Sequence, residues 1–336
     1  MNYKFLYITL LSSLLLPACS TENGMEPVLD DRPIELSFRV NDYIRDGGAL
    51  RATDDGSDAE QAVTNLYLFL FNAAGTTPVR YYIDAHSFTG GTYTAGEKRI
   101  SLNMTRAEAG ERQVYIVANC ADLEAELDAV TTVTELQTVY RNNTAPWFSN
   151  IPSPILMTGN ATHNFLADTP NAYRLEDVPL TRAVAKIELT VKLTSGFRVV
   201  PTVNNENLEE YRYRYVDFDT RTYVVKPESK PANLASSSDN VWPNTGNWTL
   251  WGNSLGGTSV PDVGTGYQQD AEDKVTELRL ITYLNERNET GAVIEIELPR
   301  ADLGSLPPPE FGPELYRLPL PGKIERNNWY KYDIEI

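Results

Sequence analysis

The sequence predicts an all-β protein made of two β-sandwich domains with a few short helices. Many short segments alternate apolar with polar side chains or run continuously apolar, which is typical of strands. Clusters of Gly, Pro, Asn and Asp separate these segments, as the turns between strands require. About 300 residues follow the N-terminal signal segment, which is more than one small domain uses, so two domains are expected.

The N-terminus directs export. Lys4 precedes an apolar run over residues 5–16, which is shorter than the roughly 20 residues of a membrane span and therefore reads as a signal peptide. Residues 16–19, Leu-Pro-Ala-Cys, resemble the lipobox of bacterial lipoproteins, which implies lipidation of Cys19 and removal of what precedes it. An ordinary signal peptide with an incidental cysteine is the alternative. Residues 1–19 are thus a signal peptide, and the polar residues 20–33 form a tether.

The first structural element is a half-buried strand over residues 34–40, because apolar and polar residues alternate strictly there. Its apolar face consists of Ile34, Leu36, Phe38 and Val40. Residues 41–61 are rich in Gly and Asp, so they are expected to form an exposed loop that proteases cut easily.

Further strands follow in the first half. Residues 63–71 are almost all apolar, which predicts a strand covered on both faces. Shorter strands are expected at 79–83, 99–104 and 113–118, with an edge strand at 155–160. Two short helices are predicted between strands, one carrying Leu123, Leu127 and Val130 on one stripe, and one that begins with a capping box at residues 132–135.

The second half repeats the pattern. Residues 185–193 alternate throughout, and we place the domain boundary after them, giving domains at 34–194 and 195–336, although a strand of this length could serve either side. More strands are expected at 211–218, 276–284, 292–298 and 329–336. Residues 226–275 are rich in Ser, Pro, Asn and Gly, so they are expected to form surface loops.

Charge and composition exclude some partners. The chain has 46 acidic and 29 basic residues, a formal net charge of −17, which repels nucleic acid and anionic lipid headgroups. A hydrophobic content of 41% and 19 tyrosines fit a folded, strand-rich chain. Cys120 is the one cysteine besides Cys19, and we expect it to be a small buried side chain.

Several segments, taken in order, resemble the fimbrillin-type subunits of type V pili, including their anchor and accessory subunits. The resemblance covers most of the chain and rests on the lipobox, Arg-Ala-Thr at 51–53, the strand at 66–71 ending in Asn-x-x-Gly, and residues 114–119, 157–159, 180–187 and 324–330.

The resemblance implies two transthyretin-like sandwiches, an outer-membrane lipoprotein and assembly with other fimbrial subunits by strand exchange, in support of adhesion to a host or bacterial surface ligand. It also implies that an arginine-specific protease cuts after Arg51, or alternatively after Arg45, and so removes residues 34–40. The alternatives are that both arginines are solvated loop residues, or that an anchor subunit stays lipidated and uncut. The strand at 329–336 could be a donor or the last strand of the second sandwich.

Catalytic motifs are weak, and we expect no enzymatic activity, cofactor or metal. Residues 252–256 match G-x-S-x-G, but neither a preceding buried strand nor a following helix is predicted there. His86 and His163 lie in loop-like sequence with no second ligand at a useful spacing. The acidic residues 54–58 lack the pattern of a calcium loop and are expected to be solvated.

The rival hypothesis is a surface lipoprotein that binds or degrades glycans. Carboxylates abound in so acidic a chain, and the separation that glycoside hydrolysis requires cannot be read from sequence. Tryptophans in loops could stack on sugars or anchor the loops to the sandwich. They are Trp147, Trp242, Trp248 and Trp251.

Overall fold

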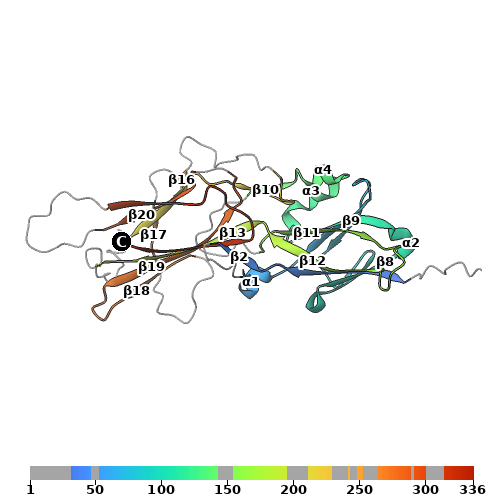
Figure 1. Ribbon diagram of the computed structural model, residues 1–336, viewed down its shortest axis with the longest axis horizontal. Helices are drawn as coiled ribbons and strands as arrows, with labels where there is room; N and C mark the ends of the chain where they lie inside the picture. Colours follow the sequence, from blue (N-terminus) through green and yellow to red (C-terminus); the bar gives the residue numbers. More distant parts are fainter. Residues whose placement is uncertain are drawn as a thin grey trace, which may run out of the picture.

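The computed structural model describes residues 32–46, 53–142, 154–194, 211–228, 241–242, 248–252, 264–288, 291–299 and 314–336. The molecule is elongated and mostly β, with most strands from the first half of the chain at one end and strands from the second half at the other (Figure 1). The predicted all-β sandwich class is confirmed. None of the helices in the described ranges has the length and apolar character needed to span a membrane.

The first half is organised around a nine-stranded sheet in the order β5-β4-β9-β11-β12-β1-β8-β7-β6. Its strands are β1 (Pro33–Val40), β4 (Leu66–Asn72), β5 (Val79–Ile83), β6 (Ser87–Phe88), β7 (Gly91–Thr94), β8 (Arg99–Thr105), β9 (Glu111–Ala118), β11 (Met157–Asn164) and β12 (Arg174–Arg182). Most neighbours are antiparallel, but β1 runs parallel to β12.

Strand β4 is covered on both faces, as its continuous apolar sequence predicts. Leu66, Leu68 and Leu70 point into a core shared with β1 and β8. Tyr67, Phe69 and Phe71 point to the opposite face, where Leu127 and Leu136 from short helices cover them.

The helices are single turns or little more, and three of them begin with a capping box. In each box a Ser or Thr hydroxyl accepts from the backbone N–H of a Glu three residues on, and that Glu carboxylate accepts from the backbone N–H of the cap residue. The helical elements are α1 (Asp58–Gln61), α2 (Arg106–Ala109), α3 (Glu124–Ala129), α4 (Val133–Leu136), η1 (Ala95–Glu97) and η2 (Ala121–Leu123).

The other end of the molecule contains a six-stranded sheet in the order β18-β19-β13-β22-β2-β3, which combines strands of the second half with two short strands from the start of the chain. Its strands are β2 (Tyr43–Asp46), β3 (Thr53–Asp54), β13 (Val184–Lys192), β18 (Gly264–Gln269), β19 (Val275–Asn285) and β22 (Asn328–Glu335). β22 lies parallel to both β13 and β2. It is therefore an integral strand of this sheet.

A smaller sheet packs against the six-stranded sheet, and the two enclose a second hydrophobic core. The smaller sheet contains β16 (Val241–Trp242), β14 (Arg212–Val216), β20 (Val293–Leu298) and β21 (Glu314–Pro319), with β17 (Thr249–Leu250) also paired to β14. Ile187 and Leu189 of β13 and Ile294 and Ile296 of β20 share this second core. A two-stranded pair, β10 (Tyr140–Asn142) with β15 (Arg221–Tyr223), joins residues from the two halves of the chain.

Two predictions about local structure are wrong. Residues 41–61 are not one exposed loop, because 43–46 and 53–54 are strands, 58–61 are helical and Tyr43 is fully buried. Of the segment predicted as an edge strand at 155–160, residues 157–160 lie instead in β11, an interior strand between β9 and β12. In both places flanking polar and Gly residues concealed a short apolar stretch that finds partners far away in sequence.

Candidate functional site

β1 occupies an interior position of the nine-stranded sheet. It runs parallel to β12, with Leu36 beside Leu175 and Val40 beside Leu180, and antiparallel to β8, with Leu36 also beside Ile100. Both of its edges therefore form strand ladders. Removing β1 would leave one unpaired edge on β12 and another on β8.

The side chains predicted for exchange form the apolar face of β1. Ile34 and Leu36 are fully buried, Phe38 is 3% exposed, and Val40 packs partly buried against the same core. The Phe38 ring stacks on Tyr93 with 6.2 Å between ring centroids. Burying side chains of this size is worth about 1.5–3 kcal/mol each, so the strand is held strongly as well as specifically.

A polar contact fixes the register of β1. The Glu35 carboxylate accepts from Arg99 Nη1 at 3.1 Å and from Arg174 Nε at 2.8 Å, one arginine from each neighbouring strand. The three side chains are a quarter to a third exposed, so solvent screens the pairs. A shift of the strand by one residue would place Glu35 in the core and break both ion pairs.

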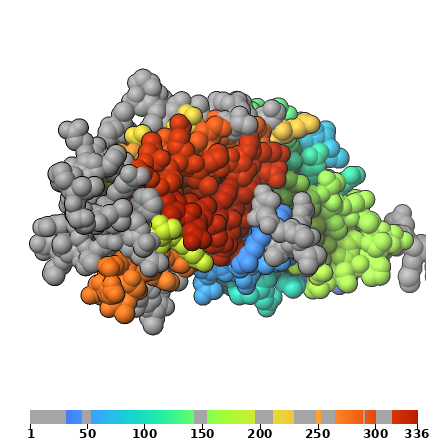
Figure 2. All heavy atoms as spheres, turned by 60° about the vertical axis from the view of Figure 1, so that its left-hand side comes forward, coloured from blue at the N-terminus to red at the C-terminus, as the bar shows by residue number. Residues whose placement is uncertain are grey.

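After β1 the chain crosses to the other sheet. The backbone N–H of Asn41 donates to Leu180 O at 2.8 Å, and Asn327 Nδ2 donates to Asp42 O at 2.6 Å. β2 then pairs with β22, bringing Ile44 beside Asn328 and Arg45 beside Trp329. Residues from the start of the described chain thus lie against its C-terminal strand, and Figure 2 shows blue atoms beside red ones at the surface.

Of the two candidate cleavage arginines, the structure describes Arg45. Arg45 lies in β2, where its guanidinium pairs with Asp54 at 3.0 Å and stacks on Trp329 with 4.4 Å from Cζ to the ring centroid. Its side chain is 43% exposed. Arg51 and Cys19 lie outside the described residues, so cleavage and lipidation remain predictions.

A buried ionic cluster holds α1 against this crossing. Lys186 Nζ lies 3.0 Å from a carboxylate oxygen of Glu60, which is fully buried, and the hydroxyl of Tyr283 donates to the same carboxylate. Arg182 Nε donates to Glu60 O at 2.9 Å, and Arg182 Nη1 donates to Asn41 O at 2.6 Å. The cluster therefore joins β12, β13 and β19 to the segment that carries β1 and β2.

Burial raises the pKa of both Tyr43 and Glu60, and the neighbouring groups add to this rise at Tyr43 but outweigh it at Glu60. Desolvation raises the pKa of Tyr43 well above its usual value, and the neighbouring Glu60 charge adds to the rise. Burial alone would raise the pKa of Glu60 too, but Lys186, Tyr283 and the Ser57 backbone N–H together lower it. Glu60 is therefore a carboxylate at neutral pH, and it neutralises the Lys186 cation.

Sequence reasoning missed this cluster. A readable signal existed in Ser57-x-x-Glu60, a capping box of the kind recognised farther along at 132–135. The alternation in β13 also places Lys186 and Glu188 on one face, which in a single-sided sheet would be solvated. Here that face is covered, and both side chains are buried.

The other candidate residues do not converge on a reactive site. His86 is exposed with Nδ1 2.7 Å from Tyr93 O, and His163 Nε2 lies 2.8 Å from Ala172 O. Cys120 is fully buried, as predicted, and burial raises its thiol pKa to about 12. Within the described ranges no group of His, Cys, Asp and Glu has the geometry to hold a metal ion. Most of the G-x-S-x-G motif lies outside those ranges.

Of the four tryptophans considered for glycan binding, the structure describes the side chains of Trp248 and Trp251. Trp251 is fully buried, and its indole N–H lies 3.0 Å from both Gly266 O and Arg279 O, so it anchors a loop to the core. Trp248 lies under the Arg214 guanidinium at 4.3 Å. Trp147 and the side chain of Trp242 lie outside what the structure describes.

Comparison with known proteins agrees with this architecture. The family described as "Major fimbrial subunit protein (FimA)" matches residues 34–208, and "Minor fimbrium tip subunit MfA4, C-terminal" matches residues 183–335. The minor fimbrium tip subunit MfA4 of Porphyromonas gingivalis is 52% identical over 338 residues, covering 100% of both chains. The chain belongs to the fimbrillin-type family of fimbrial subunits. It is a structural subunit of a cell-surface fimbrium.

A solved structure supports the fold of this fimbrial subunit. The tip fimbrial protein Mfa3 from Porphyromonas gingivalis, with a C-terminal truncation, superposes with a TM-score of 0.51 and 11% identity, covering 90% of this chain and 94% of that one. This likeness supports the β-sandwich class, whereas the fimbrillin resemblance inferred from short motifs is confirmed by the family matches and the 52% identical relative.

Proposed function

We propose that this fimbrial subunit joins its neighbour by strand exchange, with β1 as the strand that is replaced. The observation that carries the proposal is the interior position of β1, which is buried and paired on both edges although it precedes both candidate cut sites. A cut between β2 and β3 would leave β1 and β2 held by non-covalent contacts alone. A strand from another subunit could then satisfy the same backbone groups and the same apolar face.

Arg51 is the better cleavage site of the two. A protease binds its substrate as an extended, unpaired segment, whereas Arg45 sits in a strand hydrogen-bonded to both β22 and β3. Its side chain is also engaged by Asp54 and Trp329. Cutting after Arg51 would free both β1 and β2 from the rest of the chain.

Lipidation at Cys19 would bring the subunit to the outer membrane before assembly. Several acyl chains anchor a protein stably where one chain binds only marginally. Replacing Cys19 by Ala is expected to move the protein from the membrane to the soluble fraction. Unchanged membrane fractionation would contradict the lipoprotein proposal.

We place the division between the two halves near Ala183 instead of after residue 194. Among the described residues β13 pairs with β19 and β22, both from the second half, and its apolar face joins the second core.

The names of the relatives suggest a position at the fibre tip, next to other fimbrial subunits. We propose that role, without enzymatic activity, over glycan binding, because Trp251 is an anchor in the core.

The deciding experiment is limited proteolysis of the purified precursor with an arginine-specific protease, followed by N-terminal sequencing. The expected product begins at Ala52, and the released segment dissociates only in mild denaturant. Mixing the stripped product with a second fimbrial subunit should then give a stable complex. Absence of a limited cut, together with no complex, would instead indicate an uncut anchor.

A further inference from the structure

One row of side chains crosses four strands of the six-stranded sheet and alternates aromatic with basic groups. Register places Tyr283 beside Lys186, Lys186 beside Trp329, and Trp329 beside Arg45. Lys186 Nζ and Arg45 Cζ each lie 4.4 Å from the centroid of Trp329. The row thus ends on β2, the strand that contains Arg45 and precedes Arg51.

Tyr43, two residues earlier on β2, fills a second position on the same face. Its ring is fully buried, with Arg182 Cζ 4.1 Å from the ring centroid and Trp329 edge-on at 6.3 Å between centroids. Gly56 forms part of the wall, because a Cβ built there would approach the Tyr43 ring to 3.1 Å. The position is therefore shaped for a flat ring.

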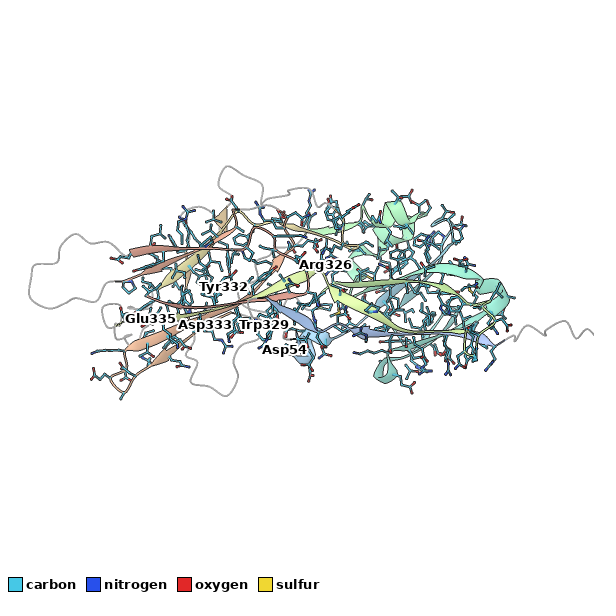
Figure 3. All side chains as sticks on the ribbon, viewed as in Figure 1. Asp54, Arg326, Trp329, Tyr332, Asp333 and Glu335 are labelled. Atoms are coloured by element: carbon cyan, nitrogen blue, oxygen red, sulfur yellow. The ribbon has the colours of Figure 1, made fainter. Side chains whose placement is uncertain are left out.

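The groups that receive these two side chains all come after the cut. Arg182, Lys186 and Trp329 lie on β12, β13 and β22, and Asp54, which pairs with Arg45 at 3.0 Å, lies on β3. In Figure 3 Trp329 and Asp54 lie near the middle of the molecule, between the strands of its two halves. Glu335 lies farther along β22, toward the left-hand end. The receiving surface would remain when β1 and β2 leave.

We infer that this surface is a specificity site, which selects an incoming subunit strand with an aromatic residue at the Tyr43 position and a basic residue at the Arg45 position. The selected pattern is three alternating apolar residues, matching Ile34, Leu36 and Phe38, then four further residues, and then aromatic-x-basic. The inference rests on the proposed strand exchange and names the chemistry of its partner.

The charges around the site explain the choice of residues. Arg182 and Lys186 are both buried, but Glu60 neutralises Lys186, and carbonyl oxygens accept from Arg182. The Arg182 guanidinium keeps its charge, because these acceptors are neutral carbonyls, and it lies 4.1 Å from the centre of the ring position. A ring there gains a cation–π contact away from water, which an aliphatic side chain lacks. At the Arg45 position, Asp54 and the Trp329 face both favour a cation.

The test uses the full chain with residues 47–52 replaced by the recognition sequence of an unrelated site-specific protease, so that cleavage does not depend on native processing. After cutting and stripping, fluorescence polarisation measures the binding of labelled synthetic peptides of residues 32–46. The variants are Tyr43→Phe, Tyr43→Leu, Arg45→Lys and Arg45→Glu. Ile44→Ala is the matched control, because Ile44 is 36% exposed between them.

The wild-type, Tyr43→Phe, Arg45→Lys and control peptides are expected to bind within about threefold of one another. Tyr43→Leu should bind about tenfold more weakly, because it loses a cation–π contact that is buried away from water. Arg45→Glu should also bind about tenfold more weakly, because it replaces attraction to Asp54 and the Trp329 face with repulsion. Equal binding by all peptides would overturn the specificity site while leaving strand exchange intact. If no peptide binds, strand exchange and the specificity site both fail.

Discussion

At the scale of single residues, Glu60 is the charge on which the crossing between the sheets depends. It is fully buried, and three of the groups around it lower its pKa below the ordinary 4.5. A carboxylate whose pKa is depressed in the folded state contributes stability that is complete above the unfolded pKa. That contribution should be lost as the pH falls below about 4.5.

Replacing Glu60 by Gln is therefore expected to destabilise the protein at pH 7 by about 3 kcal/mol, because it leaves the Lys186 cation buried without its partner. Urea unfolding at pH 7 and at pH 3.5 measures the effect, and the difference between wild type and variant should shrink at the lower pH. Glu126→Gln, at an exposed helix position, is the control. A constant difference across this pH range would contradict the assignment.

Cys120 shows burial acting on a nucleophile. Its side chain is fully buried, and desolvation raises the thiol pKa to about 12, so almost no thiolate forms at pH 8. In a chain carrying Cys19→Ala, a thiol reagent at pH 8 should label Cys120 at least 100-fold more slowly in buffer than in denaturant, an order-of-magnitude expectation. Rapid labelling of the folded chain would mean that the end of β9 opens easily.

At the scale of elements, β1 should lose its influence on stability once it is released. Phe38→Ala removes a ring that is 3% exposed, which is expected to cost about 3 kcal/mol in the intact chain. The same substitution should not alter the unfolding of the cut and stripped chain. Leu180→Ala in β12 is the matched control, since it should destabilise both forms by about 3 kcal/mol. A stripped chain that still senses Phe38→Ala would show that β1 had not left.

Sequence patterns predicted the elements that carry their own signal. The continuous apolar run of β4 and the alternation of β1, β13 and β22 each gave strands within a few residues of the observed bounds. The capping box at Thr132 likewise located α4. These elements are dictated by local periodicity, so a single sequence suffices to find them.

The pairing partners were beyond a single sequence. β2 is four residues long and lies in an acidic, glycine-rich stretch, so its burial depends on β22, almost 300 residues away. Lys186 and Arg182 gave no local sign that they face aromatic rings, because their neighbours are set by register between distant strands. The strand β1 was therefore predictable, whereas the surface that surrounds Tyr43 and Arg45 on β2 was not.

At the scale of the whole molecule, the segment from Pro33 to Asp46 connects the two halves. It places β1 in the nine-stranded sheet and β2 in the six-stranded sheet (Figure 1). Other contacts between the halves remain without it, such as the pairing of β10 with β15. Removing the segment should therefore loosen the coupling of the halves and leave each core folded.

Thermal or urea unfolding of the intact chain is expected to give one transition by both circular dichroism and tryptophan fluorescence. Four of the five tryptophans lie at or beyond position 242, so fluorescence reports mainly on the second half, while circular dichroism reports on both. In the stripped chain the two midpoints should separate. The nine-stranded sheet has lost an interior strand, whereas the second core has lost none of its side chains. Adding the peptide of residues 32–46 should bring the midpoints together again. Coincident midpoints in the stripped chain would show that the remaining contacts already couple the halves, and the segment would then be an exchangeable strand without a role in joining them.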